Sequence, residues 1–232
     1  THMKKASDRI LKRSVLSVLV TAALYTPQVM AFTKNVTADN SPVKNETVDD
    51  HSQNVQKDGR TENITITVNG QQNVKGGTAI YTTINGGAQF IDGGIANGTT
   101  INGGMQFVSS GGASSDITIN YGFQRVNDSD VSRTRINNGG KQELMGSSTA
   151  IYTTINNNGT QDVYFGSTAS DTTIYDGGMQ DVYSGGTATR TTIYDGGTLN
   201  VREGGNATGV DQKNGGALIA STDKTTVVQG NN

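Results

Sequence analysis

The chain has 232 residues, of which 31 are glycine, two are proline and none is cysteine or tryptophan. Its 18 Lys and Arg against 20 Asp and Glu leave no basic excess to neutralise phosphates, so nucleic acid is not an expected partner. The absence of cysteine excludes disulfides, thiolate nucleophiles and zinc–thiolate sites, and the glycine content favours a repetitive chain over an ordinary compact domain.

The first 31 residues have the three parts of a secretory signal. Residues 1–3 (Thr-His-Met) are interpreted as a remnant of a cloning tag, and the signal peptide is predicted over residues 4–31. Its apolar stretch, residues 14–25, is shorter than the roughly 20 residues that a membrane span needs, although a retained N-terminal anchor stays open as the alternative. Five basic residues precede that stretch: Lys4, Lys5, Arg9, Lys12 and Arg13.

Residues 32–60 are polar and show no sustained apolar alternation, which predicts a polar linker or an N-terminal cap. From residue 61 to residue 232 a self-similar unit recurs with the form T-T-I-x-x-G-G-x-Q-x-V-x-x-G-G-x-A. The domain prediction is therefore an export signal, a polar segment and one β-helical repeat region.

Three columns of residues recur at intervals of 17 to 19 residues. This period is too short for paired-helix repeats, and the Thr, Ile, Val and Tyr between the glycines favour extended backbone. The first column is Ile84, Ile101, Ile119, Ile136, Ile155, Ile174 and Ile193, with Val210 expected to continue it. The second is Gln72, Gln89, Gln106, Gln124, Gln142, Gln161 and Gln180, followed by Leu199 and Leu218. The third is Ala79, Ala96, Ala113, Val131, Ala150, Ala169, Ala188 and Ala207.

Each unit is predicted to be one turn of a coil whose strands pair in parallel with the turns above and below, about 4.8 Å apart. Glycine tolerates positive φ, so pairs such as Gly86-Gly87 and Gly177-Gly178 are expected at the corners. The sequence therefore predicts an all-β fold, a parallel β-helix (solenoid) of about nine turns with Ile and Val inside.

Units such as TTIYDGGMQDVYSGGTA (172–188) and TTINGGAQFIDGG (82–94) resemble the N-terminal passenger repeats of AIDA-type self-associating autotransporter adhesins. The resemblance implies a right-handed β-helical passenger that is exported to the bacterial cell surface through a C-terminal outer-membrane barrel. It also implies adhesion, autoaggregation or biofilm formation through the outer face of the helix. We expect this chain to be a passenger fragment, with the natural chain continuing past residue 232.

Some proteins of this family carry heptose on repeat serines and threonines, attached by a cytoplasmic heptosyltransferase. The resemblance therefore makes hydroxyls of the repeats candidate O-glycosylation sites, although outward threonines are also ordinary strand formers. A segment that serves chiefly as the substrate of such a transferase is one alternative function. The candidate acceptors are Thr82, Thr83, Ser109, Ser110, Thr153, Thr154, Ser170, Thr172 and Ser184.

Parallel β-helices also house glycan-active enzymes, which is the other alternative. Asp162 and Asp181 are expected to stack in adjacent turns with their carboxylates about 5 Å apart. Neither histidine lies in the predicted repeats, which precludes a Ser-His-Asp triad there. We predict no catalytic residue, no metal site and no cofactor.

A binding function is expected on the outward face, where tyrosines recur in adjacent turns. Aromatic rings with a hydroxyl suit contact with carbohydrate or protein. The predicted partners are a second copy of the chain on another cell, or a host or matrix glycan or protein. The predicted adhesive strip consists of Tyr164, Tyr183, Tyr175, Tyr194, Asp162 and Asp181, and Tyr81 with Tyr152 is a further aromatic pair on the outside.

Overall fold

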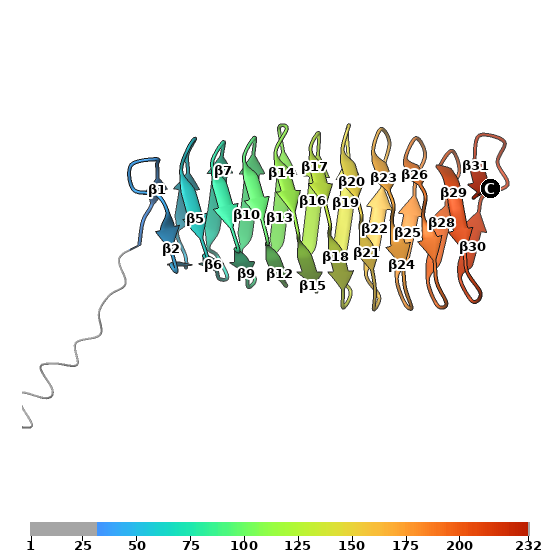
Figure 1. Cartoon of the computed structure of the whole chain (residues 1–232), viewed down its shortest axis with the longest axis horizontal. Coiled ribbons are helices and arrows are strands. Elements are labelled where there is room, and N and C mark those ends of the chain that lie inside the picture. The colour runs from blue at the N-terminus through green and yellow to red at the C-terminus, as the bar shows by residue number, and fades with distance from the viewer. Residues whose placement is uncertain (1–31, 232) are drawn as a thin grey trace, which may run out of the picture. The chain divides into compact units, whose positions relative to one another are not determined.

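A computed structural model describes residues 32–231, which form a solenoid of parallel strands (Figure 1). Each turn adds one strand to an eleven-stranded sheet, here called sheet A, and shorter strands to two further faces, sheets B and C. Every named strand pair is parallel, as the predicted β-helix requires. Among the described residues no helix has the length and apolarity to span a bilayer.

The strands follow the order A, B, C around each turn. Sheet A contains β1 (Asn35–Val36), β4 (Ser52–Val55), β7 (Gln71–Lys75), β10 (Ala88–Asp92), β13 (Met105–Ser109), β16 (Phe123–Asn127), β19 (Lys141–Met145), β22 (Thr160–Val163), β25 (Met179–Val182), β28 (Thr198–Val201) and β30 (Ala217–Ala220). Sheet B contains β2 (Val43–Lys44), β5 (Arg60–Glu62), β8 (Thr78–Ile80), β11 (Ile95–Asn97), β14 (Ala113–Ser115), β17 (Asp130–Ser132), β20 (Thr149–Ile151), β23 (Thr168–Ser170), β26 (Thr187–Thr189), β29 (Asn206–Gln212) and β31 (Val227–Gly230). Sheet C contains β3 (Thr47–Val48), β6 (Thr65–Ile66), β9 (Thr83–Ile84), β12 (Thr100–Asn102), β15 (Thr118–Asn120), β18 (Arg135–Asn137), β21 (Thr154–Ile155), β24 (Thr173–Ile174) and β27 (Thr192–Ile193), and the end of β29 joins it.

The solenoid has about eleven turns, where the sequence predicted about nine. It begins at β1, so the segment 32–60, expected as a linker or cap, already contains one complete turn and the first strand of the second. These turns keep inward residues such as Val36 and Gln53, both fully buried, but lack the glycine pairs of the later repeats. Asn45 and Asp58 take positive φ there, because Asn and Asp tolerate this conformation better than most residues. The tag remnant and the predicted signal peptide lie outside the described residues.

The core is a set of inward columns, one residue deep on each sheet. The isoleucine column from Ile84 to Ile193 has no exposed surface, and neither have Val74 and Ile91 of sheet A. Burial of each such side chain contributes roughly 1.5 to 3 kcal/mol, and because the contacts lie between turns, no single turn is stable alone.

Two residues of the predicted columns lie elsewhere. Ala113 is exposed and pairs with Ile95, whereas Ser114 takes the inward place opposite Ala96. The reason is one extra residue in the corner before β14, which shifts the register by one. Val210 is buried but does not continue the isoleucine column, because Gln212 pairs with Ile193.

The glycine pairs form corners, as predicted: pairs such as Gly177-Gly178 lie between sheets C and A, and pairs such as Gly185-Gly186 lie between sheets A and B. The first glycine of a pair has positive φ, for example 75° at Gly177 and 78° at Gly196. The second glycine has no room for a side chain: a Cβ on Gly178 would lie 2.5 Å from the carbonyl oxygen of Ile155, in the turn before. The missing side chain lets consecutive turns approach at this corner.

The glutamine column, whose role the sequence did not reveal, is a hydrogen-bonded ladder inside the solenoid. Each side-chain amide donates to the amide oxygen of the glutamine one turn earlier, for example Gln142 to Gln124 at 2.7 Å and Gln161 to Gln142 at 2.8 Å. Most of the amides also donate to a buried threonine hydroxyl of an adjacent strand end, as Gln142 does to Thr134 at 3.2 Å. All glutamines from Gln53 to Gln180 in this ladder are fully buried. The ladder fixes the register of the turns from within, because a slip would leave buried amides unpaired.

Candidate functional site

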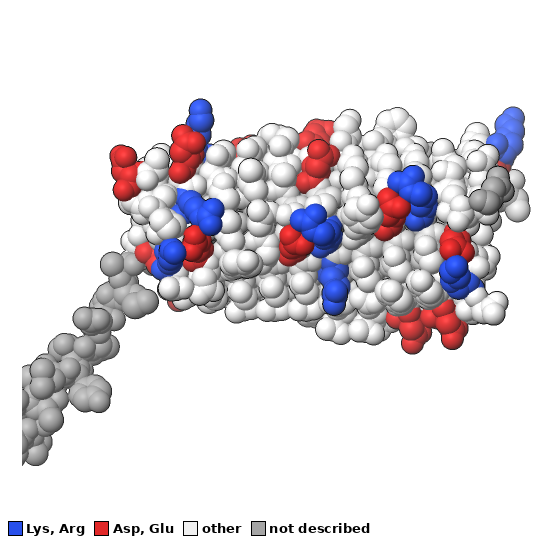
Figure 2. Space-filling model, in the orientation of Figure 1, with Lys and Arg blue, Asp and Glu red and all other residues white. Residues whose placement is uncertain are grey.

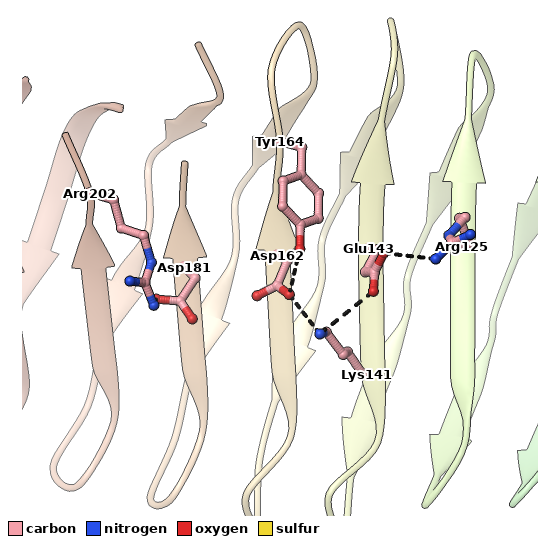
Figure 3. Close-up of polar contacts among 7 residues, drawn as sticks. All are labelled: Arg125, Lys141, Glu143, Asp162, Tyr164, Asp181 and Arg202. Carbon is pink, nitrogen blue, oxygen red and sulfur yellow. Dashed lines mark hydrogen bonds and ion pairs between the residues drawn. The ribbon is translucent and has the colours of Figure 1, made fainter. Parts of the chain in front are cut away.

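A cluster of ion-paired side chains lies on the outer face of sheet A, across β16, β19, β22, β25 and β28 (Figure 3). Strand alternation places the glutamines and valines inside, so the residues between and beside them point outward. Parallel in-register pairing then stacks the outward residues turn upon turn. Asp162 thus lies directly opposite Asp181, as predicted, and opposite Glu143 on the other side.

Asp162 is the central residue of this cluster. Its side chain is only 3% exposed, and its Oδ2 accepts a contact from Lys141 Nζ at 3.0 Å and a hydrogen bond from the Tyr164 hydroxyl at 3.3 Å. Its Oδ1 is buried and has no hydrogen-bond partner. Burial raises the pKa of Asp162 above its ordinary value, and although Lys141 opposes this effect, Asp181 adds to it. Burial likewise raises the pKa of Tyr164 to about 12.

Asp181 is likewise held by two donors, and both come from the following turn. Asn200 donates to its Oδ1 at 2.8 Å, and Arg202 Nη2 lies 3.3 Å from the same oxygen. The Arg202 guanidinium also lies over the Tyr183 ring, 4.9 Å from its centroid. At the other end of the cluster Arg125 reaches Glu143 at 3.4 Å. Most charges of the cluster are therefore compensated within the rod itself.

The predicted adhesive strip separates into two parts. Tyr164 and Tyr183 stack with ring centroids 4.6 Å apart beside the aspartates on sheet A. Tyr175 and Tyr194 stack at 5.0 Å, but they follow β24 and β27 at the corner between sheets C and A. Tyr81 and Tyr152 belong to a third place, the corner between sheets B and C. The tyrosines therefore do not form one continuous strip.

The sheet A cluster does not have the form of a hydrolytic site. A general base must reach a water or substrate proton, whereas the unpaired oxygen of Asp162 is buried and its other oxygen is held by Lys141 and Tyr164. Across residues 32–231 no group of three or more His, Asp or Glu side chains is placed to hold a metal ion. The arrangement is chemically suited to a stable, ion-paired surface.

Comparison with known proteins identifies the repeats. Residues 165–216 match the family model described as the adhesin of the bacterial autotransporter system, probable stalk. The chain is 45% identical over 78 residues to the probable autotransporter YpjA of Escherichia coli (strain K12), an alignment covering 33% of this chain and 5% of YpjA. It is 30% identical to the crystal structure of a TibA fragment hyper-glycosylated by TibC, over 86% of this chain and 95% of that fragment, with a TM-score of 0.43. The chain belongs to the AIDA-type family of autotransporter adhesins.

This AIDA-type passenger spans only a small part of YpjA. The matched segment 165–216 runs from the end of the turn that holds Asp162 through the turns of Tyr175, Asp181 and Tyr194. The family resemblance seen in the repeats is confirmed, and so is the parallel β-solenoid that it implied.

The predicted glycosylation sites fall into two groups in this passenger, and the structure corrects one of them. Thr82, Thr153 and Thr172 are buried, with at most 1% exposure, and their hydroxyls accept hydrogen bonds from the glutamine ladder. A sugar at these positions has no space in the folded solenoid. The reason is strand alternation: in each T-T-I element the first threonine points inward with the isoleucine. The predicted acceptors that reach the surface are Thr83, Ser109, Ser110, Thr154, Ser170 and Ser184.

We expect Asp162→Asn to raise the free energy of unfolding at pH 7 by on the order of 1 kcal/mol. Because the folded-state pKa of Asp162 is raised, the folded chain holds this proton more tightly than the unfolded chain, so stability falls as pH rises from acid toward neutral. Asparagine removes that penalty and fits the column, since Asn200 occupies it two turns later. Thermal unfolding at pH 7 and pH 4 measures the effect, and the gain should shrink at pH 4. A clear loss of stability at pH 7 would show that the Lys141 ion pair outweighs the burial of the charge.

Proposed function

We propose that this chain is the exported, cell-surface part of an adhesin and that its outer faces make the adhesive contacts. The observation that carries the proposal is the in-register repetition of outward side chains on a rigid rod. One outward ladder of asparagines, for example, runs from Asn85 through Asn102 and Asn120 to Asn137 and Asn156, each donating to the one before at 2.9 to 3.3 Å. A surface repeated about every 4.8 Å offers many equivalent weak contacts, and these add up when two rods lie side by side.

We further propose that the main partner is a second copy of the chain on another cell, which gives autoaggregation and supports biofilm growth. Membership of a family of autotransporter adhesins supports surface export and adhesion. A host or matrix glycan or protein is the second candidate partner, and the ion-paired face around Tyr164, Tyr183 and Asp181 is where we place that contact.

Modification by a heptosyltransferase is a separate proposal, supported by the six hydroxyls at the surface and by the glycosylated state of the TibA fragment. Coexpression with such a transferase should add sugars at Thr83, Ser109, Ser110, Thr154, Ser170 or Ser184 and at none of the three buried threonines. Peptide mass spectrometry of the purified chain tests this. Sugars found at Thr82, Thr153 or Thr172 of the folded protein would contradict the assignment.

The adhesive function is tested by displaying the passenger on a bacterial strain that does not aggregate. We expect cells that display it to settle, and in a one-to-one mixture with differently labelled bare cells the aggregates should contain displaying cells alone. Aggregates that recruit bare cells equally would indicate a heterotypic receptor. Absence of settling at full surface display would count against self-association, and binding to host cells or matrix would then be measured.

A further inference from the structure

The corner between sheets B and C is a line of residues with left-handed backbone. One residue in each of ten consecutive turns has φ between 53° and 72° there. The backbone N–H at each of the first nine corners donates to the residue preceding the same corner in the next turn, as Arg133 does to the carbonyl of Ile151 at 2.9 Å. The corner residues are therefore stacked in register. In chain order they are Asn45, Asn63, Tyr81, Gly98, Asp116, Arg133, Tyr152, Asp171, Arg190 and Gly209.

Several of these residues are unfavourable for the conformation they adopt. Glycine and asparagine adopt left-handed backbone at little cost, and the chain has them at four of these corners: Asn45, Asn63, Gly98 and Gly209. Tyrosine and arginine adopt this conformation only at a cost in conformational energy. The side chains gain little burial in return, since Tyr152 is 61% exposed and the Arg133 and Arg190 side chains are 57% and 59% exposed. Because neither backbone energy nor burial favours these residues, their presence indicates that their side chains contact another molecule.

We call the five consecutive residues between the two glycines of this line the corner ridge: Asp116, Arg133, Tyr152, Asp171 and Arg190. Within one rod Arg133 makes two hydrogen bonds to Asp116, at 2.7 and 2.9 Å, and Arg190 makes two to Asp171, both at 2.9 Å. Figure 2 shows several places on the visible face where acidic and basic side chains lie next to each other, with mostly uncharged surface between them. Glycines border the ridge on both sides, so no side chain one turn beyond either end obstructs it.

The order of charges along the ridge is its own complement when it is reversed. Read forward it is acidic, basic, tyrosine, acidic, basic; read backward it is basic, acidic, tyrosine, basic, acidic. Two ridges laid antiparallel about a two-fold axis at Tyr152 therefore place Asp116 against the second copy's Arg190, and Arg133 against its Asp171. All four acidic and basic positions match over about 19 Å of rod. In a parallel arrangement every charge would meet its like.

We propose that the corner ridge is the surface through which two copies of this chain associate, antiparallel and two-fold symmetric about Tyr152. The proposal rests on the self-association proposed above and names the face that makes it. A symmetric contact between identical surfaces is the usual form of pairing between copies of one protein. The charge order sets the register, and the tyrosines of the two copies meet at the axis.

A groove beside the ridge supports this arrangement. It has a volume of about 420 Å³ and is lined by residues of three turns, among them Asp116, Arg133, Arg135 and Tyr152. Arg135 has no ion-pair partner within residues 32–231 and interrupts a column of threonines on sheet C. The register of the proposed pair brings the second copy's Asp171 opposite Arg133, at the middle turn of this groove. Asp171 would then meet two arginines.

The sheet A cluster does not have this property. Its outward column reads Arg125, Glu143, Asp162, Asp181 and Asn200, and an antiparallel copy centred on it would set acidic residues against one another. Its aspartates are also buried against partners within the same rod. The ridge, with exposed charges in complementary order, is the better surface for a second copy.

Charge-reversal variants displayed on cells test the proposal. An acidic ridge (Arg133→Asp with Arg190→Asp) and a basic ridge (Asp116→Arg with Asp171→Arg) should each lose settling, down to the level of bare cells. A mixture of acidic-ridge and basic-ridge cells should settle again, in aggregates that contain both labels. The fourfold exchange restores the complementary order, so those cells should settle by themselves but sort away from wild-type cells.

The possible outcomes distinguish failure of the ridge proposal from failure of self-association, on which it rests. Wild-type cells that fail to settle would overturn self-association and the ridge together. Wild-type settling that the acidic ridge retains, or free mixing of fourfold-exchange cells with wild type, would overturn the ridge alone and leave self-association standing. Surface staining and thermal unfolding of each purified chain serve as controls for display and folding.

Tyr152→Asn tests whether the Tyr152 side chain acts in the contact between two copies or only in the stability of the rod. Asparagine suits the left-handed backbone, so this variant should unfold at the same temperature as wild type or higher, and yet its cells should settle more slowly by severalfold. Tyr121→Asn is the matched control, because Tyr121 also has positive φ (56°) and is 75% exposed but lies at a different corner. Equal loss of settling in both variants would overturn the assignment of the axis to Tyr152.

Discussion

Replacing Gln142 with leucine is expected to lower the free energy of unfolding by about 2 to 5 kcal/mol, even though the new side chain is apolar and enters a buried column. Gln142 donates to Gln124 at 2.7 Å and to Thr134 at 3.2 Å, and it accepts from Gln161 at 2.8 Å. Leucine makes none of these bonds. The oxygen of Gln124 loses its donor from the next turn, and the amide of Gln161 keeps only Thr153 at 3.1 Å. Each unsatisfied buried group costs about 1 to 3 kcal/mol.

Leucine is tolerated in this column at the end of the ladder. The expected loss of stability therefore depends on whether the replaced glutamine has a glutamine neighbour on both sides. Leu199 follows Gln180 in the same register, and the oxygen of Gln180 accepts from Thr191 at 2.8 Å, so no amide is left open where the ladder ends. Asn102→Leu is the control at the surface, because Asn102 also donates once and accepts once in a ladder. Water replaces the hydrogen bonds that its neighbours lose, so we expect the free energy of unfolding to change by less than about 1 kcal/mol. Denaturant unfolding of both variants measures the difference. Equal effects would mean that the buried ladder adds no more than a surface one.

The glutamine column also marks how far the sequence alone could lead. Regular spacing predicted the column and the parallel stacking, because both follow from alternation and period. The column's hydrogen bonds were not predicted, since glutamine in a strand is equally compatible with a solvated face. The buried pairing of Gln142 with Thr134 depends on two faces of one turn meeting across the core. The same contact buried three of the predicted glycosylation sites.

Local exceptions account for the other differences. The turns before residue 61 were not predicted because Asp50 and Asp58 stand at corners where later turns have the first glycine of a pair, so the glycine signature is missing while the positive φ is kept. Ala113 was placed inside by counting, although one inserted residue moved Ser114 there. The stacked pair of Asp162 and Asp181 was predicted from the period. Its ion pairs were not, because Lys141 belongs to another strand and reaches it only through the length of its side chain.

Gly178→Ala is expected to lower the free energy of unfolding by about 3 kcal/mol. The φ of Gly178 is not positive, so alanine is conformationally allowed there, and the expected cost is steric. The added Cβ would lie 2.5 Å from the carbonyl oxygen of Ile155 and 2.9 Å from its carbon. Both are backbone atoms, which cannot rotate away as a side chain could, so two turns must separate and the parallel hydrogen bonds of β21 and β24 (Thr154–Ile155 and Thr173–Ile174) must lengthen.

Gly111→Asn is the matched control. Gly111 has a φ of 74°, which asparagine tolerates, and a Cβ there would meet no atom within 4 Å. We expect a change within about 0.5 kcal/mol. Thermal unfolding gives the size of both effects, and amide hydrogen exchange locates them: faster exchange in Gly178→Ala should be confined to the turns on either side of the substitution, because each turn contacts only its neighbours. A similar loss of stability in both variants would mean that both glycines are needed for their backbone conformation. The close approach of successive turns would then not be the reason for the second glycine of each pair.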